Sequence, residues 1–143
     1  MMTEKIDSFD KEFGFLSNFS PAHVSFGGIN FPTVEHAYQA AKTFNWEDRN
    51  MIAALPTAGK AKKAGSKVTM RCDWDLAKLS VMRELLKQKF SIPKLKEQLL
   101  MTEDLELVEG NWWGDTFWGV CKGAGENHLG KLLMELRTEL NGG

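Results

Sequence analysis

The chain has 143 residues, of which 43% are apolar and 26% are charged, as expected for a globular protein with one sizeable buried core. Its formal net charge of −1 argues against non-specific duplex binding, and no apolar run is long enough to cross a membrane. The two widely spaced cysteines favour a reducing, cytoplasmic compartment over a disulfide framework. The three histidines lack zinc-ligand spacing, and we expect neither a metal nor a cofactor.

The first third of the chain predicts a strand, a loop and a hairpin. Phenylalanines are dense but irregularly spaced between residues 8 and 20, which favours a strand and a loop over one amphipathic helix. Residues 23–26 and 29–31 flank Gly27 and Gly28, and paired glycines readily adopt the positive φ of a tight hairpin turn. A small antiparallel sheet is therefore expected here.

Residues 34–42, VEHAYQAAK, predict a short helix with Thr33 as its N-cap. At 3.6 residues per turn its alanines share one side, which lets neighbouring elements approach closely. The opposite side carries Glu35, Tyr38, Gln39 and Lys42. We expect this polar side to be the free face of the helix.

The remainder of the chain is mostly helical in pattern. Helices are predicted over 46–55, 59–64, 76–90 and 91–101, and a last helix is predicted after Asn127; a short strand is predicted over 105–108. Asp75, Ser91 and Asn127 are the expected N-caps of the last three helices. The predicted fold class is therefore α+β, with a single compact, mostly helical domain over residues 1–143 and a small antiparallel sheet.

Two further stretches have unusual chemistry. Basic residues recur from Lys60 to Arg71, either as a solvated face or as a site for phosphate. Residues 111–119, NWWGDTFWG, contain three of the five tryptophans, and these are either core aromatics or flat surfaces for a ligand. Together they are the ingredients of a nucleotide or ribosyl-phosphate pocket. Kinase, dehydrogenase and deaminase motifs are absent from the sequence.

Four stretches resemble the motifs of the NADAR family, also called YbiA-like. They are FLSNF at 15–19, VEHAYQAAK at 34–42, WGD at 113–115 and NHLGKLLM at 127–134. The resemblance implies a compact, mostly helical α+β domain and N-glycoside hydrolase activity. Some members remove ADP-ribose from ADP-ribosylated guanine in DNA or RNA, and others cleave early riboflavin-pathway intermediates.

The resemblance also implies site residues. The essential acid of the family matches Glu35, its lysine matches Lys42, and its functional tryptophan and aspartate match Trp74 and Asp115, with Asn18 in the N-terminal motif. We expect Glu35, Lys42 and Asp115 to be catalytic. The expected substrate-binding residues are Asn18, Trp74, Trp113, Trp118, Lys62 and Asn127. The chain departs from the family pattern at 65–67, GSK, where many relatives have Gly-Arg, and in the additional Trp112.

These residues favour one function and leave alternatives open. The favoured function is removal of ADP-ribose from guanine in nucleic acid, so the expected ligands are ADP-ribose or a ribosyl phosphate and ADP-ribosylated DNA or RNA. Riboflavin intermediates are the alternative substrates, and a non-catalytic module that binds NAD or ADP-ribose is the alternative class. In the expected mechanism Glu35 transfers protons and the Lys42 amine forms a Schiff base; in its rival Glu35 activates water and Asp115 orients it.

Overall fold

The computed structural model describes residues 5–142, which divide into two compact units. One, the middle unit, is the continuous stretch of residues 18–91. The other, the terminal unit, joins residues 5–17 to residues 92–142. The expectation of one domain over residues 1–143 stays a prediction.

The middle unit begins with the predicted hairpin. Strands β2 (Pro21–Phe26) and β3 (Ile29–Thr33) pair antiparallel, with a register irregularity between Pro21 and Val24. Gly27 and Gly28 take φ values of 58° and 82°, the left-handed conformation that the turn requires. The glycine pair therefore predicted the hairpin correctly.

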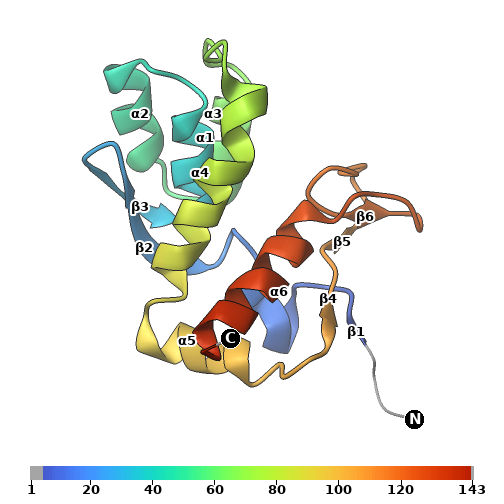
Figure 1. The fold of residues 1–143 in the computed structure, drawn as a ribbon. Coiled ribbons are helices and arrows are strands. Elements are labelled where there is room, and N and C mark those ends of the chain that lie inside the picture. The colour runs from blue at the N-terminus through green and yellow to red at the C-terminus, as the bar shows by residue number, and fades with distance from the viewer. Residues whose placement is uncertain (1–4, 143) are drawn as a thin grey trace. The chain divides into compact units, whose positions relative to one another are not determined.

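Four helices of the middle unit follow the hairpin. They are α1 (Val34–Ala41), α2 (Trp46–Ala53), α3 (Ala58–Gly65) and α4 (Trp74–Lys89). In Figure 1, α1 lies among α2, α3 and α4, with the hairpin beside them, and it contacts all of these elements. Thr33 caps α1 as predicted, because its side chain accepts a hydrogen bond from the His36 backbone N–H.

This central position overturns the expectation of a polar free face on α1. All eight residues from Val34 to Ala41 are buried. Helical periodicity identifies which side chains share a face, but the second layer that covers the face comes from elements distant in the sequence. The polar side of α1 is therefore interior, and its polar atoms need partners or a ligand.

Several predicted helix ends shift by one or a few residues. Helix α4 begins at Trp74, so Asp73 occupies the N-cap position instead of Asp75. The Asp73 carboxylate makes no cap bond because the Arg71 guanidinium takes both of its oxygens, at 2.6 and 2.9 Å. Similarly, Ile92 and not Ser91 precedes α5 (Pro93–Leu100).

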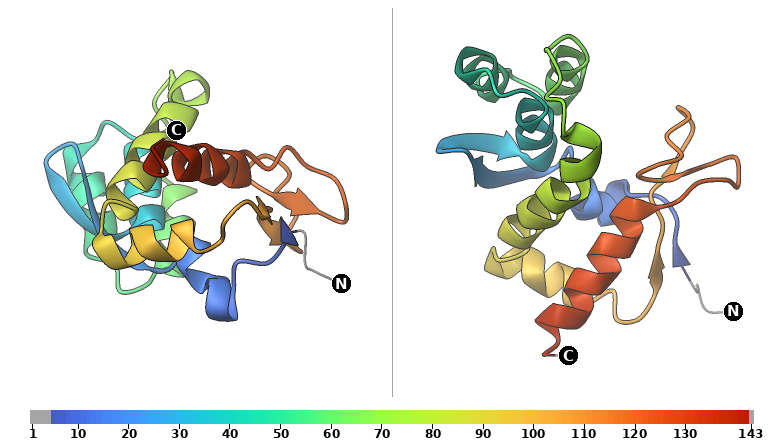
Figure 2. Two further views of the ribbon diagram at one scale, coloured as in Figure 1. Left: turned by 60° about the horizontal axis from the view of Figure 1, so that its bottom comes forward. Right: turned by 45° about the horizontal axis from the view of Figure 1, so that its top comes forward.

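The terminal unit is built on α5 and α6 (His128–Leu140). Residues 11–16 form a 3-10 helix, η1 (Lys11–Leu16), preceded by β1 (Lys5–Ile6), so the expected loop is partly helical. The strands β4 (Glu106–Leu107), β5 (Gly110–Asn111) and β6 (Val120–Cys121) are short. Figure 2 shows β1 beside β4 and α6 beside α5, and the structure pairs β1 with β4 and β5 with β6.

Both strand pairs of the terminal unit are parallel, so the antiparallel expectation holds only for the hairpin. The α+β class itself is confirmed. The predicted leucine stripe of α6 supplies core side chains at Leu129, Leu132, Leu133 and Leu136. Among residues 5–142, no helix combines the length and apolar character needed to cross a membrane.

Candidate active site

Glu35 lies in the first turn of α1 and is 7% exposed. Its Oε2 accepts a hydrogen bond of 2.5 Å from the side-chain amide of Gln39, one turn further along the helix. Its backbone N–H donates to the main-chain carbonyl of Asn18 at 3.1 Å. The carboxylate is thus held in a fixed orientation inside the middle unit.

Two buried acceptors belong to residues that hydrogen-bond Glu35. Within the described residues 5–142, the buried side-chain polar atoms that have no hydrogen-bond partner are Asn18 Oδ1 and Gln39 Oε1. Asn18 is otherwise held through its amide nitrogen, which lies 3.6 Å from Met82 Sδ. An unsatisfied buried acceptor costs about 1–3 kcal/mol, and a ligand that supplies donors would remove this cost.

Lys42 follows the last residue of α1 and is half-buried. Its ammonium lies 5.6 Å from the centroid of the Tyr38 ring. Burial lowers the pKa of Lys42 below its ordinary value, while the negative charge of Glu35 raises it. The net direction is downward, and it increases the fraction of neutral amine that can act as a nucleophile near neutral pH.

Lys62 is electrostatically coupled to Lys42. Its positive charge is the next cause that lowers the Lys42 pKa, followed by that of Lys78. Lys62 lies in the last turn of α3, and α3 packs against α1. The predicted phosphate-binding lysine is therefore close enough to tune the predicted nucleophile.

The close approach of α3 to α1 depends on Gly65. A Cβ at this position would overlap the side chain of Gln39. Gly65 therefore lets the last turn of α3 lie directly on the residue that holds Glu35. The chain keeps the glycine of the family pattern while the following Ser66 and Lys67 depart from it.

Trp74 is buried, with 4% of its surface exposed. Its ring centroid lies 5.1 Å from that of Tyr38, whose other neighbour is the Lys42 ammonium. The geometry makes Trp74 a support for Tyr38 and, through it, for Lys42. Its expected role as a substrate-binding residue stays a prediction.

Both ring nitrogens of His36 have hydrogen-bond partners. Its Nε2 lies 3.0 Å from the Leu55 carbonyl, which can only accept, so Nε2 donates. Its Nδ1 lies 2.7 Å from the Thr33 hydroxyl. His36 thus ties the start of α1 to the segment that follows α2.

The other predicted site residues lie in the terminal unit. Asp115 Oδ1 accepts hydrogen bonds from the backbone N–H groups of Phe117 and Trp118, at 3.1 and 2.9 Å. The side chain of Asn111 bonds both the N–H and the carbonyl of Asp115. Asp115 therefore shapes its own loop, whatever further role it has in chemistry.

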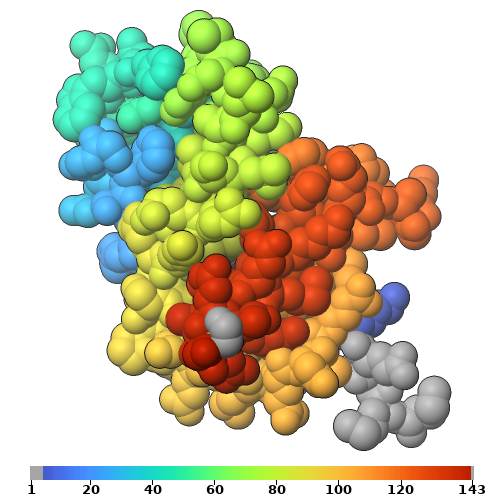
Figure 3. Space-filling view, in the orientation of Figure 1, coloured from blue at the N-terminus to red at the C-terminus, as the bar shows by residue number. Residues whose placement is uncertain are grey.

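The tryptophans of this loop differ in exposure. Trp112 is 84% exposed and Trp113 is 48% exposed, and their rings meet edge to face at 5.6 Å. Trp118 is half-buried against Phe117, at 4.8 Å. In Figure 3 the segment between β5 and α6 projects beyond α6, which suits a ligand-contacting loop better than a core.

Asn127 is the N-cap residue of α6, as predicted, but its side chain makes no cap hydrogen bond. It adopts φ 53°, and its side chain turns to the main chain before the loop. Oδ1 accepts from the Glu109 N–H and Nδ2 donates to the Leu107 carbonyl, both at 3.0 Å. The amide is thus committed to holding residues 107–109, and its predicted contact with substrate stays a prediction.

The structure groups the predicted residues by unit. In the middle unit Asn18, Glu35, Lys42, Lys62 and Trp74 all lie on or against α1. In the terminal unit Trp113, Asp115, Trp118 and Asn127 belong to one stretch of loop and its anchor. Gln39 is a site residue to which the sequence analysis assigned no role. Its spacing of four from Glu35 was the available signal.

Comparisons with known proteins identify the family of the chain. A family model described as the NADAR domain matches residues 6–141. The N-glycosidase Npun_R5314 of Nostoc punctiforme is 42% identical over 135 residues, covering 90% of this chain and 86% of that protein. The NMR structure of the Escherichia coli protein YbiA matches with a TM-score of 0.84 and 34% identity, covering 99% of this chain and 88% of that one.

A third relative has a different name. The riboflavin biosynthesis protein PYRR, chloroplastic, of Zea mays is 38% identical over 149 residues, and the match covers 91% of this chain but only 24% of that longer protein. The protein is an N-glycosidase, which is a hydrolase that acts on N-glycosyl bonds. The chain belongs to the NADAR family.

Proposed function

We propose that this N-glycosidase removes ADP-ribose from ADP-ribosylated guanine in DNA or RNA. The observation that carries the proposal is the arrangement on α1 of the buried Glu35 carboxylate and the Lys42 amine, whose pKa is lowered. A held acid and a partly neutral amine are the two groups needed to open a ribosyl ring and capture its anomeric carbon.

The proposed reaction proceeds through a Schiff base. Glu35 protonates the ring oxygen of the ribose, and the bond between this oxygen and the anomeric carbon breaks to leave an iminium with the base nitrogen. The Lys42 amine adds to the same carbon, and the base nitrogen leaves with a proton. Water then hydrolyses the lysine imine, which restores the amine and releases the ribose as an aldehyde that recloses. The balance is one water consumed for one N-glycosidic bond cleaved.

The rival mechanism has no covalent step. Glu35 removes a proton from water, the water oxygen attacks the anomeric carbon, and the base leaves. Here Lys42 remains charged and only stabilises the anionic part of the substrate. The downward shift of the Lys42 pKa, caused mainly by burial, supports the Schiff base, because a residue that acts only as a cation gains nothing from a lowered pKa.

The remaining polar groups suit a ribosyl substrate. Asn18 Oδ1 and Gln39 Oε1 would accept hydrogen bonds from sugar hydroxyls or from an amino group of the base. Lys62 would take a phosphate, and an ADP-ribosyl group carries two. The exposed face of Trp113 would stack on a base.

A second candidate substrate is a ribosylaminopyrimidine phosphate of the riboflavin pathway. The name of the maize relative favours it, although the match covers only part of that protein. Such a compound presents the same ribose carbon and base nitrogen, with one phosphate in place of two. The same acid and amine would therefore serve both substrates.

Parallel incubations separate the two substrates. Purified protein is given an oligonucleotide with ADP-ribosylated guanine and, separately, ribosylaminopyrimidine phosphates, and free ADP-ribose or ribose phosphate is measured by liquid chromatography and mass spectrometry. Release of ADP-ribose at the higher kcat/KM is the expected result. Faster release of ribose phosphate would favour the second candidate, and binding of ADP-ribose without turnover of either substrate would contradict both.

A further inference from the structure

A groove of about 530 Å³ lies between α2 and α3, on the middle unit. Its α2 side is lined by Asp48 and Met51, followed by Leu55, and its α3 side is lined by Lys60 and Lys63, followed by Lys67. The proposed reaction does not use these side chains, and none of them is among the predicted catalytic or substrate-binding residues. The groove is therefore a separate feature of the middle unit.

The lysines of α3 divide between two faces of the helix. Lys60 and Lys63 are three residues apart, so their side chains share one face of α3, which is the groove wall, and Lys67 lines the groove from the turn after the helix. Lys62 lies about 160–200° around the axis from Lys60, on the side that affects Lys42. The basic run thus separates into one lysine for the active site and three for the groove.

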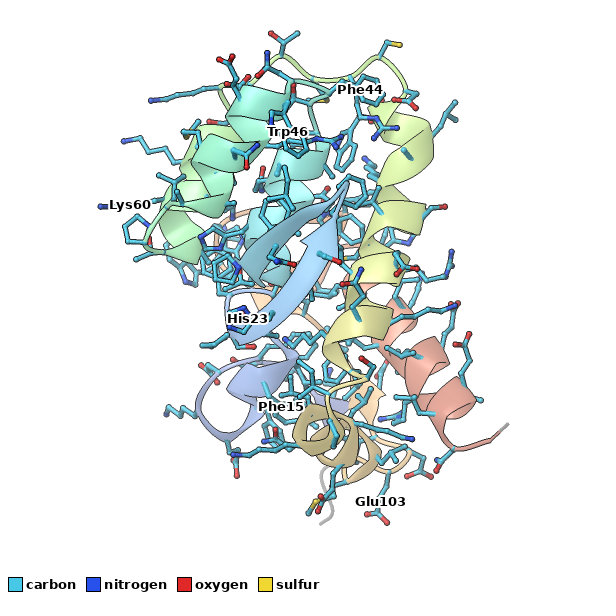
Figure 4. The ribbon with its side chains drawn as sticks, turned by 90° about the vertical axis from the view of Figure 1, so that its left-hand side faces the viewer. Phe15, His23, Phe44, Trp46, Lys60 and Glu103 are labelled. Carbon is cyan, nitrogen blue, oxygen red and sulfur yellow. The ribbon has the colours of Figure 1, made fainter. Side chains whose placement is uncertain are left out.

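The charge of the groove suits a polyanion. Its three lysines are opposed by one acid, Asp48, among the lining residues. The same lining includes apolar surface from Met51, Leu55 and Val68, and Met51 is itself exposed. Lys60 points outward from α3 in Figure 4, so its ammonium is accessible to a phosphate.

Two exposed aromatic residues stand where α1 leads into α2. Phe44 is 65% exposed and Trp46 is 58% exposed, and Figure 4 shows both at this end of the middle unit. The Arg71 guanidinium lies 4.3 Å from the Phe44 ring centroid and is held by Asp73. The Arg71 side chain is only 14% exposed, so it braces the Phe44 ring from one side while the ring itself is open to solvent.

One short segment connects the groove to these aromatic rings. Lys67, Val68 and Thr69 line the groove, and Arg71 follows only two residues later. The four steps along the chain from Lys67 to Arg71 span at most about 14 Å. The Arg71 backbone N–H also donates to the Lys42 carbonyl at 2.6 Å, so the aromatic surface adjoins the end of α1 that carries the predicted nucleophile.

We propose that this surface binds a single strand of nucleic acid, with phosphates along Lys60, Lys63 and Lys67 and unstacked bases on the exposed rings of Phe44 and Trp46. A basic groove next to exposed aromatic faces is the combination that single-strand binding uses. A duplex has no free base faces for the aromatics, and a small phosphate would use only the lysines. The claim that this surface holds the substrate strand during the reaction rests on the proposed function. The claim that it binds an unmodified single strand does not.

The test is the affinity for an unmodified, fluorescein-labelled single-stranded DNA of about twelve nucleotides, measured by fluorescence anisotropy over a series of salt concentrations. Changing Lys60, Lys63 and Lys67 together to Glu should weaken binding about tenfold or more. It should also flatten the slope of log K against log salt by about 2, since each lost phosphate contact contributes roughly 0.7 for a single strand.

A matched control changes the same total charge elsewhere. Lys87, Lys94 and Lys96 are exposed and lie on α4 and α5, and their joint change to Glu should alter affinity several-fold less. Phe44→Ala and Trp46→Ala should each weaken binding about fivefold or more, with the salt slope unchanged. A duplex of the same sequence should bind more weakly than the single strand.

Other results would contradict the proposal that this surface binds a single strand. If the two triple variants lost equal affinity, the binding would be a general charge effect. If the unaltered protein did not bind the strand at low salt, the proposed surface would be wrong. Binding that inorganic tripolyphosphate abolishes and that Phe44→Ala leaves unchanged would make the groove a phosphate site only. Measurements of turnover separate the two proposals. Strand binding without hydrolysis of ADP-ribosylated guanine would contradict the proposed function alone. Hydrolysis with an unchanged KM in the variant with Lys60, Lys63 and Lys67 changed to Glu would contradict the proposed surface alone.

Discussion

Gln39 donates its side-chain amide to Glu35 Oε2 at 2.5 Å, one turn along the same helix. Both residues are buried, so the carboxylate that we assign to catalysis has one oxygen oriented by a neutral donor. The carbonyl oxygen of the same amide is one of the two partnerless buried acceptors in the described residues. One amide group of Gln39 thus both orients the Glu35 carboxylate and offers an acceptor to a substrate.

The Glu35→Gln variant should lose turnover by about 100-fold or more, the usual scale for a general acid or base. The amide is nearly isosteric, so the melting temperature followed by circular dichroism should change little. Glu47→Gln, at an exposed acid in the first turn of α2, is the control that should keep normal turnover. Near-normal turnover of Glu35→Gln would remove Glu35 from the reaction.

Borohydride added during turnover should trap a ribosyl adduct on Lys42. A lysine imine is reduced to a stable amine, whereas direct attack by water leaves nothing on the protein. Peptide mass spectrometry should map the adduct to Lys42, and Lys42→Ala and Lys42→Arg should show neither adduct nor appreciable activity, because arginine stays protonated. An adduct on Lys62 would assign the nucleophile to the other lysine, and full activity of Lys42→Ala would favour water attack.

The pH dependence of turnover should respond to Lys62. The positive charge of Lys62 lowers the pKa of Lys42, so Lys62→Met should raise this pKa toward its ordinary value. Because the neutral amine reacts, the alkaline rise of kcat should move to higher pH in this variant. Lys87→Met, at an exposed lysine of α4, should leave the profile in place. An unshifted profile in Lys62→Met would mean that the amine of Lys42 does not titrate in the rate-limiting step.

Asp115 can be tested with a pair of substitutions. Asp115→Asn keeps an oxygen that can accept from the Phe117 and Trp118 N–H groups, whereas Asp115→Ala removes it. If the charge serves the reaction, Asp115→Asn should lose most of its turnover while its melting temperature stays close to that of the unaltered protein. Normal turnover of Asp115→Asn combined with a loss in Asp115→Ala would limit Asp115 to shaping the loop.

Trp74 and Trp113 should respond differently to truncation. Trp74 is buried against Tyr38, so Trp74→Ala should cost about 3–5 kcal/mol of unfolding free energy. Trp113 is half-exposed, so Trp113→Ala should leave stability nearly unchanged and weaken ADP-ribose binding by about 1–3 kcal/mol if it stacks on a base. Calorimetric titration and thermal melting of both variants measure the two effects, and unchanged binding by Trp113→Ala would remove its predicted role.

The sequence pattern was sufficient to predict the elements that depend on residues close together in the chain. The hairpin follows from two adjacent glycines, and the start of α1 follows from a threonine whose side chain bonds an N–H three residues later. The core stripe of α6 follows from its leucine spacing. The family motifs identified the class of protein, and they named Glu35 and Lys42 as candidates whose roles stay predictions.

Only the tertiary structure decided what surrounds these residues. Periodicity placed Glu35, Gln39 and Lys42 on one side of a helix, but the elements packed around α1, with α3 brought close by Gly65, made this side interior, and burial is the main cause that lowers the pKa of Lys42. Sequence spacing also could not reveal that the side chain of Asn127, the N-cap residue of α6, bonds Leu107 and Glu109 instead of an N–H of the helix. Burial and hydrogen-bond partners depend on segments distant in the chain, and therefore on how the whole chain packs, whereas turns and caps depend on neighbours within a few residues.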